Sequence, residues 1–258
     1  MKIQYMSDLH MELVDNCRFI KQVQIPVTGD ILVLAGDSFY LNAQALPLKG
    51  FWQWASDNYQ QVILVPGNHE FYAYCDIMER GLRWRQMIHP NVGIYQNQVL
   101  NIGNTDFILS TLWSHIDERN GFFVQRGLAD FHRTKYNGEI LTMAQYNQLH
   151  EYCLDFIKKS VAASTAEHKI VVTHHLPTTL VVAPWHQGSV LNSAFATELG
   201  SFIAESDIDV WIYGHSHTNF DATIGKTKIV CNQLGYKFEY MSKSRKSNGF
   251  SFGKCFTI

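Results

Sequence analysis

Five short apolar runs constrain the fold of this chain more than any other feature of its sequence. They span residues 3–6, 31–35, 62–65, 170–173 and 210–213. Each run is rich in Val, Ile, Leu or Tyr and is too short for a helix, so each predicts a β-strand. Because most of these runs are apolar almost without interruption, we expect strands that are buried on both faces, as in sheets covered by helices.

The segments between these runs predict helices. Residues 47–59, 76–88, 142–163 and 193–204 have the apolar spacing or the capping residues that are typical of helices. Strands that alternate with helices indicate an α/β architecture. Toward the C-terminus, residues 220–224, 228–231 and 250–258 predict short strands instead, with a hairpin at residues 224–227.

Composition limits the organisation and the partners of the chain. Of its 258 residues 46% are hydrophobic, and no repeat or linker-like stretch divides them, which predicts one domain spanning residues 1–258. The formal charge of −2 provides no general field that would attract nucleic acid or an anionic membrane. The five cysteines form no C-x-x-C pair, and no apolar run approaches the roughly 20 residues of a membrane span. We therefore expect a cytoplasmic protein without a disulfide framework.

Each of the five predicted strands ends in side chains that can bind a metal ion. They are Asp8 and His10 after the first strand, Asp37 after the second, Asn68 and His69 after the third, His174 after the fourth, and His215 and His217 after the fifth. With His175, which follows His174, six of the twelve histidines lie at these strand ends. Each motif is common by itself, but the ordered set indicates a site, because functional groups gather beyond the carboxyl ends of strands in α/β sheets.

The chemistry of this set predicts a centre with two metal ions. Carboxylate, imidazole and amide donors without thiolates suit Mn, Fe, Zn or Co ions better than Ca²⁺ or Mg²⁺ alone. Seven ligands are too many for one ion with an open position, but they suit two ions that share a carboxylate. Such a pair binds a phosphate ester and lowers the pKa of a bridging water, which predicts a dinuclear-metal phosphoric ester hydrolase. Gly36, Gly67 and Gly214 would allow sharp turns that bring the ligands together.

The order of these motifs resembles the signature of the calcineurin-like metallophosphoesterases. The matching blocks are Asp8-Leu-His10, Gly36-Asp37, Gly67-Asn68-His69-Glu70, His174 and Gly214-His215-Ser-His217. The resemblance implies a four-layer α/β/β/α sandwich with two mixed β-sheets and a metal site at the C-terminal ends of strands. It also implies that Asp8, His10 and His217 hold one ion, that Asn68, His174 and His215 hold the other, and that Asp37 bridges both.

The resemblance further implies how the reaction proceeds. A metal-bridging hydroxide would attack the phosphorus directly, without a phosphoenzyme. His69 would be catalytic, acting on the leaving group or on the developing phosphoryl charge. The predicted function is therefore hydrolysis of a phosphomonoester or a phosphodiester in a small substrate.

The second motif bears on the branch of the family. Serine/threonine protein phosphatases of this superfamily read G-D-x-V-D-R-G, whereas this chain continues from Asp37 as Ser-Phe-Tyr40-Leu-Asn42, without the second Asp and the Arg. Cyclic-nucleotide diesterases and lipid A pathway hydrolases usually carry an acidic residue where this chain has Tyr40. The chain is therefore most similar to uncharacterised bacterial phosphoesterases of the superfamily.

Two other functions stay open at this point. A nuclease would need an extended electropositive groove, against which the charge of −2 argues. A scaffold or partner-binding protein would keep the fold without catalysis, against which the complete set of predicted ligands argues. The sequence gives no indication of the oligomeric state.

Several residues near the motifs have two interpretations each. We expect His175 to lie outside the ligand set, because neighbours on an extended segment point in opposite directions. His186 borders the substrate pocket or lies in an ordinary surface loop, and the long segment 113–140, with Asp130, forms a lid or lies at the periphery. Glu70 orients a ligand or caps a helix. A basic cluster binds a phosphate-rich substrate or is a solvated face; it comprises Lys237, Lys243, Arg245, Lys246 and Lys254.

Overall fold

Two mixed, six-stranded β-sheets form the centre of the computed structural model, which describes residues 1–42, 49–237 and 248–258. The first sheet has the order β14-β1-β2-β3-β5-β4. Its strands are β1 (Lys2–Met6), β2 (Ile31–Ala35), β3 (Gln61–Val65), β4 (Trp84–His89), β5 (Val92–Gln96) and β14 (Cys255–Thr257). Four neighbouring strands are parallel, and the edge strands β14 and β4 are antiparallel to them.

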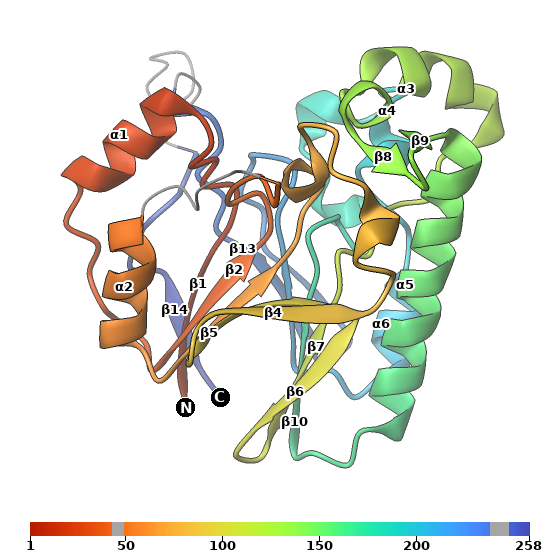
Figure 1. Cartoon of the computed structure of the whole chain (residues 1–258). Coiled ribbons are helices and arrows are strands. Elements are labelled where there is room, and N and C mark those ends of the chain that lie inside the picture. Colours follow the sequence, from red (N-terminus) through yellow and green to blue (C-terminus); the bar gives the residue numbers. More distant parts are fainter. Residues whose placement is uncertain (43–48, 238–247) are drawn as a thin grey trace.

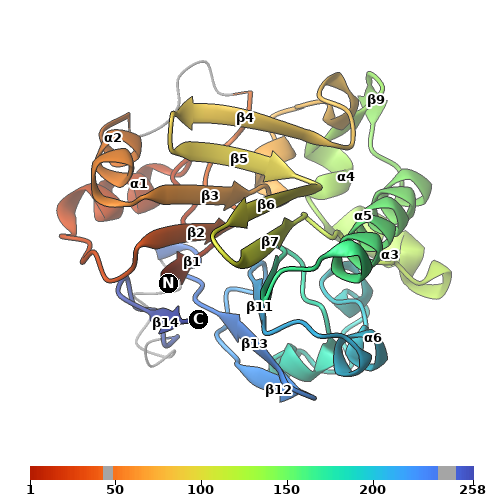
Figure 2. The same ribbon diagram turned by 90° about the horizontal axis from the view of Figure 1, so that it is seen from below.

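The second sheet repeats this plan. Its order is β12-β13-β11-β10-β7-β6. Its strands are β6 (Gln98–Ile102), β7 (Thr105–Leu109), β10 (His168–Val172), β11 (Val210–Tyr213), β12 (Ala222–Ile224) and β13 (Thr227–Cys231). Again four parallel strands are flanked by antiparallel edge strands, here β12 and β6 (Figure 2).

Helices cover the outer faces of both sheets. Helices α1 (Val14–Gln22) and α2 (Lys49–Asn58) lie against the first sheet, whereas α5 (Met143–Ala163) and α6 (Gly200–Glu205) lie against the second (Figure 1). The layers therefore run α/β/β/α, and the predicted sandwich with two mixed sheets is confirmed. Among the described residues, no helix combines the length and the apolarity needed to cross a membrane.

The alternation of side chains along each strand explains how the layers hold together. On β2, Ile31 and Val33 point between the sheets, where they pack with residues such as Phe107 of the second sheet. Leu32 and Leu34 point the other way, into a core with the outer helices. Because both sets are fully buried, the strand is apolar throughout, as the sequence indicated.

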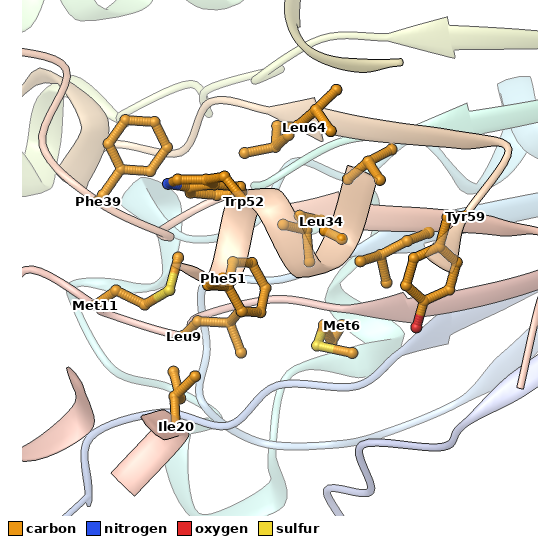
Figure 3. Packing of buried hydrophobic residues seen from close by; sticks show 14 of the residues in the cluster. Met6, Leu9, Met11, Ile20, Leu34, Phe39, Phe51, Trp52, Tyr59 and Leu64 are labelled. Carbon is orange, nitrogen blue, oxygen red and sulfur yellow. The ribbon is translucent and has the colours of Figure 1, made fainter. Parts of the chain in front are cut away.

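The core under α1 and α2 is rich in aromatic side chains. Trp52 of α2 is 1% exposed and packs edge-to-face on Phe39 and Phe51, with ring centroids 5.3 and 4.9 Å away (Figure 3). Leu9 and Met11, which flank the predicted ligand His10, belong to the same cluster. The loop that carries His10 is thus anchored by apolar contacts.

Two of the four predicted helices match the structure closely. Thr142 begins α5 with a capping box. Its side-chain oxygen accepts a hydrogen bond from the Gln145 backbone N–H, and the Gln145 side-chain oxygen accepts one from the Thr142 backbone N–H. Helix α2 covers residues 49–58 of the predicted 47–59, and residues 47–48 lie outside the described part of the chain. The hairpin at residues 224–227 joins β12 to β13.

The other two predicted helices were wrong in whole or in part. Asp76 does cap a helix, but only the short 3₁₀ turn Ile77–Glu79, and residues 84–89 form strand β4. Residues 84–89 form a strand because pairing with β5 satisfies the hydrogen-bonding groups of their backbone, although their side chains are only half buried. Residues 193–204 split into the 3₁₀ turn Asn192–Ala194 and helix α6, because a β-bridge between Leu176 and Ala196 interrupts them.

The segment 113–140 forms a cap of its own. It contains the 3₁₀ turn Glu118–Asn120, helices α3 (Gly121–Gly127) and α4 (Asp130–Arg133), and the small hairpin of β8 (Lys135–Tyr136) and β9 (Glu139–Ile140). In Figure 1 these elements lie at the end of the sandwich toward which β1 and β2 run. The other 3₁₀ turns are His69–Phe71, Thr179–Val181 and Pro184–His186.

Candidate metal centre

The loops that follow β1, β2, β3, β10 and β11 meet at one end of the sandwich, and they bring all the predicted site residues together. Asp8, His10, Asp37, Asn68 and His69 come from the first sheet. His174, His215 and His217 come from the second sheet. The backbone joins the loops directly: the Asp8 amide donates to Gly36 O at 3.0 Å and the Gly214 amide to His174 O at 2.9 Å.

The first group of potential ligands is Asp8, His10 and His217. One donor atom from each lies within 4.8 Å of the others. His217 Nε2 is 3.0 Å from His10 Nε2 and 3.5 Å from Asp8 Oδ1. Asp8 and His10 are fully buried. Three donor atoms that converge inside the protein leave room for a shared cation between them.

The second group is Asp37, His174 and His215, whose donor atoms also lie within 4.8 Å of one another. His174 Nε2 is 3.3 Å from Asp37 Oδ1 and 3.1 Å from Asn68 Oδ1, so the amide oxygen joins the group. The other carboxylate oxygen of Asp37, Oδ2, is 3.9 Å from His10 Nε2. Asp37 therefore lies between the two groups, with one oxygen toward each.

The backbone is strained at the ligands themselves. Left-handed conformations occur at Asp8, His10, Asp37, His215 and His217, where φ is 56°, 46°, 54°, 77° and 52°. Each such residue costs about 1–3 kcal/mol, and the strain persists only where packing and hydrogen bonds fix the loop. The concentration of this strain at five of seven predicted ligands is typical of a functional site.

Glycines at the strand ends make the close approach possible. A Cβ on Gly67 would collide with Asp37 Oδ1, and a Cβ on Gly36, where φ is +90°, would collide with the His174 ring. A Cβ on Gly214 would lie 2.9 Å from Asp8 Oδ2. The predicted close approach of the ligands is confirmed at all three glycines, and of the three only Gly36 has a positive φ.

The charges in the site match a cation-binding role. Burial raises the pKa of Asp37, but the neighbouring His174 and His69 lower it more, so the carboxyl pKa is well below its usual range. Burial, together with His175 and His174, places the pKa of His215 well below its usual range, so His215 is neutral. Its Nε2 is buried and has no hydrogen-bond partner among the described residues. An orphaned neutral imidazole nitrogen beside a carboxylate fits a metal ion.

Glu70 fixes the loops that carry Asp37 and Asn68. Its carboxylate accepts backbone hydrogen bonds from Asp37 at 2.9 Å, Ser38 at 2.7 Å, Phe39 at 3.2 Å and Gly67 at 2.7 Å. Burial and the charge of Asp37 raise the pKa of Glu70 to about 7. Of its two predicted roles, the structure shows the first, because Glu70 orients Asp37 through the backbone.

Glu12 is a site residue that sequence reasoning missed. Its Oε1 accepts hydrogen bonds from two histidines, His10 Nδ1 at 3.0 Å and His69 Nδ1 at 2.9 Å, and its side chain is only 4% exposed. Because a carboxylate only accepts, Nδ1 carries a proton in both rings. In a neutral ring Nε2 is then a free acceptor that can bind a metal ion, and in a charged ring Nε2 is a second donor. The sequence signal that could have indicated Glu12 was a carboxylate two positions after the predicted ligand His10.

The cap contributes further residues to the site. Asp130 of α4 is buried and accepts hydrogen bonds from Tyr72 OH at 2.9 Å and from Asn68 Nδ2 at 3.4 Å. Asn68 Nδ2 also donates to Tyr72 OH at 3.0 Å, and these two bonds leave the amide oxygen of Asn68 facing His174. Arg133 stands over the Tyr72 ring, 5.1 Å from its centroid. The segment 113–140 thus reaches the site, whereas the side chain of His132 is exposed and its Nε2 lies 3.4 Å from Arg126 O.

A cavity of about 360 Å³ lies beside the two ligand groups. Asp37, Asn68, His69, His215 and His217 line it, together with residues of the cap, Tyr236 and His186. His186 therefore borders this cavity, which supports the first of its two interpretations. His175 lies outside the ligand groups: it is buried, and its Nε2 is 3.1 Å from Tyr146 OH.

The two described lysines of the basic C-terminal cluster, Lys237 and Lys254, form no anion site. Lys254 pairs with Asp221 at 3.0 Å, and Lys237 Nζ lies 3.6 Å from the centroid of the Phe19 ring. Both described lysines are thus engaged within the chain. Lys243, Arg245 and Lys246 lie outside the described residues.

Known proteins resemble this chain in sequence or in fold. The family model described as calcineurin-like phosphoesterase matches residues 1–219. An uncharacterised protein of Acanthamoeba polyphaga mimivirus is 29% identical over 261 residues, covering 92% of each chain. The crystal structure of phosphopantetheinyl hydrolase from Mycobacterium tuberculosis matches with a TM-score of 0.68 at 14% identity, over 96% of this chain and 94% of that one. At that identity the structural match shows a common fold.

Proposed function

The chain belongs to the calcineurin-like phosphoesterase family, and we propose that it hydrolyses phosphomonoesters or phosphodiesters of small molecules at a centre of two transition-metal ions. Asp8, His10 and His217 would hold one ion. Asn68, His174 and His215 would hold the other, and Asp37 would contribute one oxygen to each. Mn, Fe, Zn and Co ions all suit this mixture of imidazole, carboxylate and amide donors.

The observation that carries the proposal is the pair of ligand groups on either side of Asp37. Asp37 belongs to the second group, and its Oδ2 lies 3.9 Å from His10 Nε2 of the first group. Together the two groups use donors that follow strands of both sheets. The orphaned Nε2 of His215 supports the same assignment, since a buried imidazole nitrogen without a partner is rare unless something else binds it. Two ions, when bound, would supply Lewis acidity that polarises the phosphoryl group and raises the acidity of the attacking water.

His69 has the geometry of a proton donor to the leaving group. Glu12 holds its Nδ1 at 2.9 Å, so its Nε2 is directed into the cavity, 3.9 Å from Asp37 Oδ2 and 3.4 Å from Tyr236 OH. Burial lowers the pKa of His69, but the charge of Asp37 and the bond to Glu12 raise it by more. A protonated ring beside the phosphoryl position can donate to the departing oxygen and stabilise the developing negative charge.

The cavity favours a small ester over a nucleic acid. Arg133 is the only Lys or Arg among the described residues that line it. Extended nucleic acid binding needs a row of cations along a groove, and such a row is not found in the described part of this surface. One arginine at the edge of the pocket suits a single additional anionic or polar group on a small substrate.

Hydrolysis assays of matched variants test the proposal. With Mn²⁺, the protein should release p-nitrophenol from para-nitrophenyl phosphate or bis-para-nitrophenyl phosphate, and a chelator should abolish the activity. Asp37→Asn should remove most activity and lower the bound metal, measured by elemental analysis. His69→Ala should keep its metal and lose turnover, most of all on esters with poor leaving groups.

Two exposed positions provide the controls. Asp57→Asn and His132→Ala change the same residue types away from the ligand groups and should leave metal content and turnover unchanged. A protein that binds no metal and hydrolyses neither ester would instead support the scaffold function. Full turnover of a poor-leaving-group ester by His69→Ala would contradict the role given to this residue.

A further inference from the structure

A second, smaller cavity of about 130 Å³ adjoins the catalytic one. It shares three lining residues with the catalytic cavity, namely His186, Phe195 and Ser216. Phe195 also stacks on the ring of His215, with centroids 4.4 Å apart and planes at 27°. The small cavity is therefore placed beside the side chains that would bind the phosphoryl group, and a substrate can extend from one cavity into the other.

The rest of this side cavity is mainly apolar. Leu176, Val182, Ala183 and Leu191 contribute to its lining, and no Asp, Glu, Lys or Arg is among the described lining residues. Three of its polar side chains have partners within the chain: Asn192 Nδ2 donates to His186 O at 2.7 Å, Ser216 Oγ donates to Thr218 O at 3.2 Å, and Ser189 Oγ accepts from the Leu191 backbone amide at 3.3 Å. The fourth, His186, also lines the catalytic cavity. A charged group would lose its hydration here without compensation, whereas an uncharged apolar group would gain by burial.

The volume of the side cavity limits what it can hold. An apolar cavity of about 150 Å³ accommodates a benzene ring, so about 130 Å³ suits a single ring or a short branched chain. We propose that this side cavity binds an uncharged apolar portion of the ester, of about the size of one six-membered ring, while the ligand groups bind its phosphate. This inference rests on the proposed function and names the substrate class: phosphate esters with a compact apolar substituent.

Binding of two phosphonates tests the inference without a need for turnover. Methylphosphonate and benzylphosphonate share the anionic group and differ in the apolar one. Isothermal titration of the Mn²⁺-loaded protein should show benzylphosphonate binding at least about ten-fold more tightly. In Ala183→Leu, which fills the side cavity, the two affinities should come within about three-fold of each other. Ala163→Leu, at an exposed position of α5, should preserve the preference.

Because Ala183 is buried, a second variant guards against loss of folding. Ser189→Phe alters the lining from an exposed position and should likewise remove the preference for benzylphosphonate. Equal affinities for both ligands in the unaltered protein would overturn the inference and leave the proposed function intact. So would a preference that survives both cavity-filling variants, because the ring would then bind elsewhere. Failure of both phosphonates to bind, with no ester hydrolysed, would overturn the proposed function and the inference with it.

Discussion

Replacing Glu12 by alanine removes one carboxylate oxygen that accepts hydrogen bonds from two histidines at once. The bond to His69 measures 2.9 Å and the bond to His10 measures 3.0 Å, and the Glu12 side chain is 4% exposed. Hydrogen bonds to charged groups contribute about 1.5–3 kcal/mol each. If the bond to His69 stabilises the ring while it donates its proton, its loss should lower kcat by about 10- to 150-fold.

The leaving group separates this effect from a general loss of structure. An alkoxide needs a proton as it departs, whereas p-nitrophenolate departs readily without one. At saturating Mn²⁺, Glu12→Ala should therefore show the full decrease on an alkyl phosphate, measured as released inorganic phosphate. On para-nitrophenyl phosphate it should lose less than about three-fold, because a better leaving group has little need of the acid.

Two further variants assign the effect to the carboxylate. Glu12→Gln keeps an acceptor oxygen for the two rings but loses the negative charge, so it should retain metal and show an intermediate decrease on the alkyl ester. Asp15→Asn changes an exposed carboxylate three residues along the chain, which forms a surface ion pair with Arg18, and should behave like the unaltered protein. Equal decreases on both esters in Glu12→Gln would refute the positioning role, and so would full alkyl ester turnover in Glu12→Ala.

Four other expectations follow from the same contacts. Gly67→Ala should reduce Mn²⁺ affinity by at least about ten-fold in calorimetric titration, because its methyl would displace Asp37, whereas Gly50→Ala meets no atom within 4 Å and should not. Asp130→Ala removes one of the two acceptors of Asn68 Nδ2 and also the acceptor of the other, Tyr72 OH, so it should weaken Mn²⁺ binding by about ten-fold, and an unchanged affinity would contradict the role of the cap. Tyr146→Phe loses its bonds to His175 and Ala194, so its free energy of unfolding in urea should fall by about 1–2 kcal/mol while metal content stays constant. Mn²⁺ at one hundred times its Kd should raise the free energy of unfolding by about 2.7 kcal/mol, and no change would argue against a metal site.

The strands and the ligand set could be predicted because they depend on simple periodic rules. A buried parallel strand is apolar throughout, and the loops at its carboxyl end carry the chemistry, so Asp37 after residues 31–35 and His215 after residues 210–213 were visible in the sequence. The polar edge strands were not predicted. β4 and β6 are half exposed, and pairing with β5 and β7 rather than any strong apolar pattern makes them strands.

The residues that surround the ligands were harder to predict, because irregular backbone places them. Glu12 reaches both histidines only because the chain turns through a left-handed residue at His10, where φ is 46°. No periodic rule describes such a turn. Asp130 lies 62 positions from Asn68 in the sequence, and its approach depends on how the cap folds back over the site. Both carboxylates are also plausible as solvated surface residues when read from the sequence alone.

The arrangement of ligands across two sheets links metal binding to the stability of the whole sandwich. Asp37 belongs to the first sheet, whereas its partners His174 and His215 belong to the second, so an ion held by all three would connect the sheets at their ends. Elsewhere the sheets are joined by apolar contacts such as those of Val33 and Phe107. These contacts must offset the left-handed conformations at five of the ligands and the burial of Asp37, whose charge a cation would neutralise. Loss of metal should therefore loosen the ligand loops first, while the apolar contacts between the sheets keep the sandwich folded.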